Sequence, residues 1–412
     1  MAYDEATYRR QGDDEPIDPA AYRANTLAAA DQRRRAAEMM EDIGATSIEA
    51  SHRAAGDDGR DRLGIHLGWE VVLLLAAAAF GLLLYRLDPS SLKRPALDTL
   101  LVTGAAIGLL TLGGGLTLRA GVPNLAIGPI ALAASLQYAE QGDLGLVKAV
   151  VPALIVAAAG GLAVGLLIVA LHVPGWVATL AAALGVIVYD QLRVAPVAVQ
   201  GQYDPSKQAF FLFGGFALLA VIGGALGTIQ PVRRWVGRMR PVGDPADRRG
   251  TAAALPVIGS LMVSSVFAVG AGVLFAAVST RPIVPGTGLE WTGIAIGVAM
   301  LAGTSAYGRR GGIFGALFAV AALTMFLDYA GRKNYDIALF AIAACVLGGG
   351  LIATRLVETY GRPLSAKTGE DWNAAPTTGP NWAPLDLPEN WTPAAAASRP
   401  DRWDAGPWGS TR

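Results

Sequence analysis

The sequence predicts an all-α, polytopic membrane protein with about ten transmembrane helices and a polar tail at each end. Hydrophobic residues make up 53% of the 412 residues and charged residues only 16%, which is too apolar for an ordinary soluble protein. The apolar residues are gathered into runs of about 20, the length at which a helix crosses the hydrocarbon core of a bilayer. The pattern therefore indicates three parts: a polar tail over residues 1–65, a transmembrane domain over 66–357 and a second tail over 358–412.

The N-terminal tail is polar and rich in alanine, and the first apolar run begins only near residue 67. A secretory signal peptide has its apolar run much nearer the start, so we expect the first span to anchor the protein and the tail to stay in the cytoplasm. Asp18 and Pro19 are suited to begin a helix and Gly44 to end one, which favours a surface helix over residues 19–43. The alternatives are a solvated tail and a docking site for a cytoplasmic partner.

Ten apolar segments follow one another between the tails, so we expect both tails on the same side of the membrane. The second and fourth segments are rich in Gly and Ala. Because small residues let helices approach closely in lipid, these two segments are expected in the interior of the bundle. The ten segments are 67–87, 97–118, 122–139, 148–172, 174–191, 208–228, 253–280, 288–304, 311–328 and 336–356.

The distribution of arginine favours cytoplasmic tails, because cytoplasmic loops of membrane proteins carry an excess of Lys and Arg. The loop 229–252 carries six arginines, but the loops expected on the two sides have similar totals of Lys and Arg. Arg60 and Arg62 before the first span and Arg355 in the last one tip the count toward the side of the tails. We therefore expect a multi-pass protein of the cytoplasmic membrane. After residue 358, five of the nine Trp residues are mixed with Pro and Ala, a composition typical of a disordered tail.

The chain lacks the residue patterns of an enzyme or of a cofactor or metal site. Its single cysteine, Cys345, lies in an apolar run, and none of its lysines follows a glycine as a phosphate-binding loop requires. If ATP powers transport, another subunit must bind it. The net charge of zero gives no indication of nucleic-acid binding, and the lipid bilayer is the expected surrounding. Glu70, Asp98, Asp190 and Asp328 all lie near span ends, which argues against a proton-coupled carrier but leaves sodium coupling through backbone carbonyls open.

The third apolar segment begins with an interruption. Gly121 and Pro123 disturb the apolar pattern, and Pro129 is expected to bend or break the helix around it. A broken helix inside a bundle frees backbone groups that can face a substrate path, and Asn124 is the polar side chain placed to use it. The alternative is an ordinary helix start capped by Asn124.

Two further stretches carry polar residues between spans. Pro174 and Gly175 restart a helix after the fourth span, and Thr179 in that helix either lines the path or bonds to its own backbone. Residues 302–316 form a Gly-rich turn between the eighth and ninth spans, in which Arg309 and Arg310 require water. A plain helical hairpin turn is the alternative interpretation of this segment.

Four stretches in this order resemble the membrane permeases of bacterial ABC importers for ribose and other monosaccharides, a family that also includes branched-chain amino acid and nucleoside permeases. The resemblance covers about residues 68–356 and neither tail. The stretches are Gly121-Val-Pro-Asn-Leu-Ala-Ile-Gly128, Val173-Pro-Gly-Trp-Val-Ala-Thr-Leu180, Gly286-Thr-Gly-Leu-Glu290 and Gly303-Thr-Ser-Ala-Tyr-Gly-Arg-Arg-Gly-Gly312 with Gly315.

The resemblance implies a permease subunit that moves a small polar solute by alternating access, with a monosaccharide as the first expectation. It implies a second permease subunit, separate ABC ATPase subunits and an extracytoplasmic solute-binding protein as partners. Asn124, Thr179 and Thr287 are the residues expected to line the path. The loop after the sixth span would seat on the ATPase, through Arg238, Asp244, Asp247, Arg248 and Arg249.

The physical chemistry of that loop agrees with such a contact, because Asp244 and Pro245 can begin a short helix and arginines can pair with acidic residues of a soluble partner. A loop that is merely positive on the cytoplasmic side is the alternative. Two other functions stay open from the sequence. One is a membrane scaffold or assembly protein that acts through its tails, and the other is a sodium-coupled secondary transporter.

Overall fold

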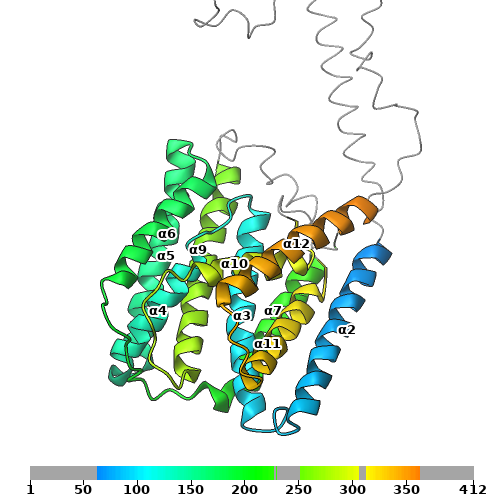
Figure 1. The fold of residues 1–412 in the computed structure, drawn as a ribbon. Coiled ribbons are helices and arrows are strands. Elements are labelled where there is room, and N and C mark those ends of the chain that lie inside the picture. Colours follow the sequence, from blue (N-terminus) through cyan, green and yellow to red (C-terminus); the bar gives the residue numbers. More distant parts are fainter. Residues whose placement is uncertain (1–62, 227–228, 230–250, 306–311, 362–412) are drawn as a thin grey trace, which may run out of the picture. The chain divides into compact units, whose positions relative to one another are not determined.

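The computed structural model describes residues 63–226, 229, 251–305 and 312–361, and these residues are built from helices (Figure 1). Within them there are ten α-helices and two short 3-10 helices. The α-helices are α2 (Leu63–Leu87), α3 (Ala96–Arg119), α4 (Ile127–Gln141), α5 (Leu146–Leu171), α6 (Gly175–Gln191), α7 (Ala209–Leu226), α9 (Thr251–Val278), α10 (Leu289–Leu301), α11 (Gly315–Arg332) and α12 (Leu339–Gly361); the 3-10 helices are η1 (Gly142–Leu144) and η2 (Pro205–Gln208).

Six of the described helices are long and apolar enough to cross a bilayer. They are α2, α3, α5, α7 together with η2, α9 and α12. For the described residues, the prediction of an all-helical, multi-pass membrane protein is confirmed, whereas the number of ten spans stays a prediction. The other four α-helices, α4, α6, α10 and α11, have 13 to 18 residues. At 1.5 Å per residue, α4 and α10 reach only about 20 Å, which is less than the hydrocarbon thickness of a bilayer.

The predicted boundaries differ most from the structure in the third segment. We expected a helix over 122–139, but α4 begins only at Ile127. The chain between α3 and α4 is not helical, because Gly121 adopts a positive φ of 75° and Pro123 cannot donate a helical hydrogen bond. Pro129 does not break α4, since it stands in the first turn, where no backbone donor is needed.

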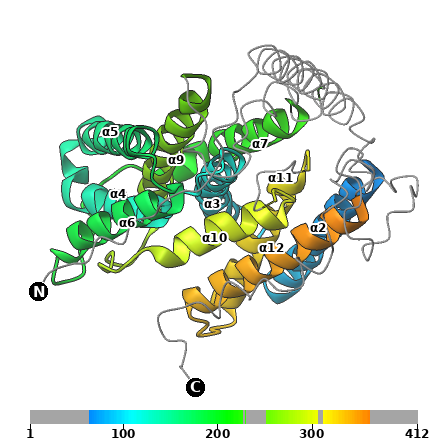
Figure 2. The same ribbon diagram turned by 90° about the horizontal axis from the view of Figure 1, so that it is seen from above.

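The centre of the bundle is formed by α3 and α9. Seen from above, α4, α5 and α6 lie on one side of α3, and α2, α11 and α12 lie on the other (Figure 2). Glycines let neighbours approach α3 closely: a Cβ at Gly108 would meet the Phe216 ring of α7, and one at Gly114 would meet the backbone of Ala295 in α10. The expectation that the Gly-rich second segment is interior is therefore confirmed for α3.

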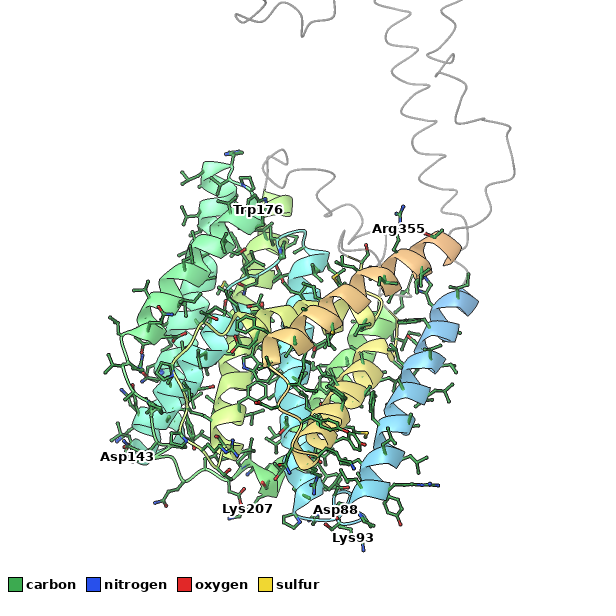
Figure 3. All side chains as sticks on the ribbon, viewed as in Figure 1. Asp88, Lys93, Asp143, Trp176, Lys207 and Arg355 are labelled. Carbon is green, nitrogen blue, oxygen red and sulfur yellow. The ribbon has the colours of Figure 1, made fainter. Side chains whose placement is uncertain are left out.

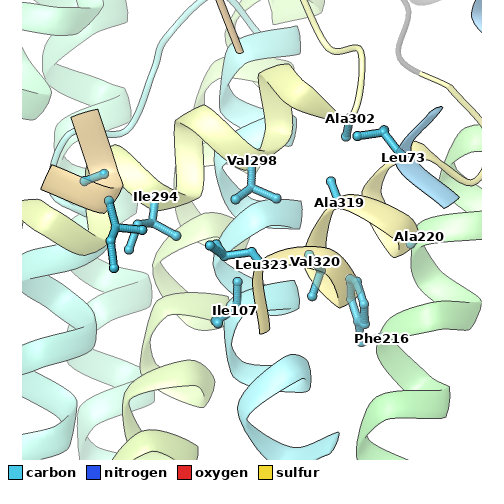
Figure 4. Packing of buried hydrophobic residues seen from close by; sticks show 12 residues of the cluster. Leu73, Ile107, Phe216, Ala220, Ile294, Val298, Ala302, Ala319, Val320 and Leu323 are labelled. Atoms are coloured by element: carbon cyan, nitrogen blue, oxygen red, sulfur yellow. The ribbon is translucent and has the colours of Figure 1, made fainter. Parts of the chain in front are cut away.

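The same expectation is wrong for α5 as a whole. Gly161 and Gly165 pack against the backbone of α9, but most of the helix is exposed on its outer face. One face of α5 thus packs closely against α9, and the opposite face is exposed. Across the bundle from α5, side chains of α2, α3, α7, α10 and α11 form the largest apolar cluster, which includes Leu73, Ile107, Phe216, Val298 and Leu323 (Figure 4).

The described helices have two distinct ends. Asp88, Lys93, Asp143 and Lys207 lie at one end, and Trp176 and Arg355 lie toward the other (Figure 3). The start of α2 and the end of α12 lie at the same end as Arg355 (Figure 1). This arrangement agrees with the expectation that both tails leave from one side of the membrane. The two tails, residues 1–62 and 362–412, lie outside the described residues, and their predicted properties stay predictions.

Candidate functional site

Two long helices of the core are each followed by a non-helical break and a short helix. In the first case α3 is followed by residues 120–126 and α4, and in the second α9 is followed by residues 279–288 and α10. Both breaks contain a glycine with positive φ, Gly121 at 75° and Gly288 at 67°. The two units run in opposite directions, because α3 starts and α9 ends at the same end of the bundle, the end at which Lys93 lies (Figures 1 and 3).

The N-termini of the two short helices meet inside the bundle. The Gly128 amide of α4 donates to Thr292 Oγ1 of α10 at 3.1 Å, and this hydroxyl donates to the Leu125 carbonyl at 3.0 Å. The approach requires glycine on both sides, since a Cβ at Gly128 would meet the Gly288 carbonyl and one at Gly288 would meet the Gly128 backbone. Thr292 is therefore the side chain that joins the two breaks.

The other polar groups of the first break are satisfied by side chains from three helices. The Asn124 amide donates to Thr117 Oγ1 at 3.3 Å, and Thr179 Oγ1 donates to the Pro123 carbonyl at 2.8 Å. The Asn124 side chain donates from Nδ2 to Ser264 Oγ at 3.1 Å and accepts from the Ala126 amide at 3.1 Å. Because an unsatisfied backbone group inside a membrane costs several kcal/mol, these hydroxyls and this amide are what allow the helix to stay broken.

A cavity of about 510 Å³ lies beside this break, between α4, α5, α6 and α9. This volume is within the usual range of small-molecule sites. Its wall is mainly Ala, Val, Gly, Ile and Leu, with four polar side chains: Asn124, Gln137, Tyr189 and Ser265. Asn124 and Ser265 are almost fully buried, whereas Tyr189 is exposed at the opening.

The three residues predicted to line a path are placed differently. Asn124 lines the cavity. Thr179 is buried under it and fixes the Pro123 carbonyl, with a weaker bond at 3.3 Å to the Trp176 carbonyl of its own helix. Thr287 lies in the second break, where its hydroxyl accepts from the amide of Leu289, the first residue of α10, at 3.4 Å. Their roles in transport stay predictions.

The residues predicted to contact an ATPase lie outside the described residues, so the structure gives no account of Arg238, Asp244, Asp247, Arg248 and Arg249. Sequence reasoning overlooked Thr292, Gln137 and Tyr189. A single threonine or tyrosine in an apolar run gives no signal of its own. The consecutive pair Ser264 and Ser265 inside an apolar segment was the one visible sign of a polar partner for Asn124.

A polar cluster from α4 and the end of α6 lies at the end of the cavity nearest Asp143. Tyr189 Oη lies 3.3 Å from Gln137 Oε1, and Arg193 binds Glu140 through two hydrogen bonds of 2.5 and 2.7 Å. These bonds to Glu140 raise the pKa of Arg193, which keeps the guanidinium charged. Asp190, on the neighbouring turn, is fully buried, and its carboxylate oxygens have no hydrogen-bond partner in the described part of the chain.

A second polar contact holds the Gly-rich turn from outside the core. Glu70 is 4% exposed in the second turn of α2, and its Oε1 accepts from the Phe314 amide at 3.1 Å. Trp69 Nε1 donates to the Leu301 carbonyl at 2.7 Å. Gly312 lets the Glu70 carboxylate approach, because a Cβ there would displace that carboxylate. The first span thus binds both described edges of the turn, whose residues 306–311 lie outside the described ranges.

No three His, Cys, Asp or Glu side chains gather as metal ligands among the described residues. Comparison of the chain with protein-family models, with curated proteins and with solved structures found no match. The candidate site therefore rests on the geometry of the break, the cavity and the two short helices.

Proposed function

We propose that the chain is the membrane-spanning permease subunit of an ATP-driven importer, with ten spans in the cytoplasmic membrane and both tails in the cytoplasm. The observation that carries the proposal is the cavity of about 510 Å³ beside a buried helix break, with Asn124 at their junction. Broken helices near the middle of a bundle are a recurrent feature of transport sites, because they bring backbone groups to a substrate. The sequence resemblance to sugar-importer permeases supports the same assignment.

The proposed mechanism is alternating access without bond chemistry in this subunit. ATP would bind to separate ABC ATPase subunits, and their closure would move the loop that contains Arg238, Asp244, Asp247, Arg248 and Arg249. Two permease subunits would then expose the path alternately to each side, and an extracytoplasmic binding protein would supply a small solute. The resemblance favours a monosaccharide first, and a branched-chain amino acid or a nucleoside next.

The proposal is tested by the accessibility of the cavity. Cys345→Ala removes the only cysteine, and Ala133→Cys then places one thiol on the cavity wall with a small change in volume. In inverted membrane vesicles that also contain the ATPase, we expect ATP with vanadate to change the rate at which a hydrophilic maleimide labels this thiol. Ala105→Cys, on the buried face of α3 in the closed apolar core, is the matched control and should stay unlabelled. A labelling rate at position 133 that is independent of nucleotide contradicts the proposal.

A sodium-coupled secondary transporter is the second candidate, because two short helices that meet with their N-termini also suit such carriers. The energy source distinguishes the two candidates. A secondary carrier changes the accessibility of position 133 when sodium is added, and needs neither ATP nor a further subunit.

A further inference from the structure

The cavity wall offers few polar groups to a ligand. Four of the twenty lining residues have polar side chains, and three of these already make hydrogen bonds within the protein. Asn124 is engaged with Ser264 and Ala126, while Gln137 and Tyr189 lie within hydrogen-bond distance of each other. A sugar would bring many hydroxyls that the wall cannot satisfy, and each buried unsatisfied hydroxyl costs about 1–3 kcal/mol. The wall therefore suits a ligand whose body is aliphatic.

Three of the four polar groups lie at the two ends of the cavity. Gln137 and Tyr189 lie at the end nearest Asp143, next to the Arg193–Glu140 ion pair. Asn124 lies at the opposite end, beside the helix break. Apart from Ser265 on α9, the wall between them consists of small and branched aliphatic residues such as Ala134, Ala157 and Val186. An elongated apolar chain with one polar head matches this distribution.

The cavity opens between α5 and α6 toward the outer surface of the bundle. On α5 the rim is a stripe at helical spacing, Pro152, Val156 and Gly160, and all three residues are exposed. On α6 the rim is Gly185 and Tyr189, which are also exposed. The outer faces of both helices beside the rim are apolar, with Ile155 63% and Val188 62% exposed. A ligand that resides in the hydrocarbon of the bilayer has direct access to this opening.

We propose that the cavity between α4, α5, α6 and α9 binds the aliphatic chain of a single amphiphile, which enters sideways from the bilayer and leaves its polar head at Gln137 and Tyr189. This inference rests on the proposed function in one respect: both take this cavity as the place where the transported ligand binds. It names a ligand class different from the sugar that the sequence resemblance favours.

Two glycines of the rim make the proposal testable without damage to the fold. A Cβ at Gly160 or at Gly185 would meet no atom within 4 Å, although both residues line the cavity. Gly160→Leu and Gly185→Leu therefore fill the cavity from opposite walls. Gly215→Leu is the matched control, because Gly215 is equally open and exposed but lies on α7, away from the cavity.

The experiment is photolabelling of the full-length protein in phosphatidylcholine nanodiscs, with labelled peptides identified by mass spectrometry. One arm uses palmitic acid that carries a diazirine, and the other uses phosphatidylcholine with the same diazirine in its acyl chain. We expect label on the cavity-facing residues of α4, α5, α6 and α9, about tenfold weaker in Gly160→Leu and in Gly185→Leu and unchanged in Gly215→Leu. Label in both arms identifies a membrane lipid as a source, and label from palmitic acid alone identifies a free amphiphile.

Two outcomes overturn the proposal. One is label spread evenly over the exposed faces of α2 and α12 and insensitive to both rim variants, which indicates boundary lipid only. The other is complete displacement of the label by excess ribose, which indicates a sugar site. The measurement uses neither ATP nor an ATPase, so its failure leaves the importer assignment standing, and failure of the importer assignment does not change its result.

Discussion

Gly128 and Gly288 are the residues that allow the N-termini of α4 and α10 to meet. Their backbones lie so close that neither can carry a side chain without displacing the other. The positive φ of Gly288 adds a second requirement for glycine at that position. Gly128 has no such backbone constraint, so its substitution reports on close packing alone.

We predict that Gly128→Ala lowers the free energy of unfolding by about 1–3 kcal/mol, the usual cost of overpacking. The measurement is denaturation of the purified protein in mixed micelles, followed by tryptophan fluorescence. Gly214→Ala on α7 is the control, because its Cβ would enter open space. Equal stability of the two variants would show that α4 and α10 do not meet at this point.

Thr292 bridges the two breaks through a single hydroxyl that both donates and accepts. Thr292→Val keeps the shape of the side chain but leaves the Leu125 carbonyl and the Gly128 amide without this partner. We predict a loss of about 1–3 kcal/mol in the same assay, while Thr292→Ser, which retains the hydroxyl, stays near the parent protein. If Val and Ser variants are equally stable, the hydroxyl does not hold the junction.

At the scale of elements, α2 acts as a clamp on the Gly-rich turn. Trp69 binds Leu301, before the turn, and Glu70 binds Phe314, at its other end. A carboxylate in an apolar surrounding is costly unless it is hydrogen-bonded. The buried Glu70 is therefore explained by its acceptance of the Phe314 amide proton.

We predict that Glu70→Ala speeds hydrogen exchange at the Phe314 amide by about tenfold or more, because that amide loses its acceptor. Glu70→Gln retains an acceptor oxygen and should protect the amide almost as well as the parent side chain. Exchange is measured by mass spectrometry on peptides that contain residues 312–318. Unchanged exchange in Glu70→Ala would contradict the clamp.

At the scale of the whole molecule, the helical, multi-pass fold could be predicted because apolar runs of bilayer length are a strong signal. The start of α4 was predicted five residues too early, since Pro123 and Gly121 mark an interruption but do not say where the helix resumes. Asn124 was found because it stands in that interruption. Thr292 could not be found, because its partner Leu125 is 167 residues away and the contact exists only after packing. The cavity likewise depends on the spacing of four helices.

The arrangement of the two ends of the bundle predicts a topology. In a Cys345→Ala background, single cysteines that replace Asp88, Lys93, Asp143 or Lys207 should react with a membrane-impermeant maleimide in intact cells. A cysteine at Trp176 or Arg355 should react only after the membrane is opened. Reaction of both groups from the same side would contradict ten membrane crossings with cytoplasmic tails.

Affinity purification in mild detergent, with the neighbouring genes co-expressed, tests whether this chain is one subunit of an ATP-driven importer. We predict an ATPase subunit bound at a ratio near one to one, and loss of that subunit when Arg248 and Arg249 are both replaced by Glu. A matched pair of substitutions to Glu at Arg9 and Arg10 in the N-terminal tail should leave the complex intact. A chain that is purified alone, or with partners held only through its tails, would contradict the importer assignment and favour a membrane scaffold.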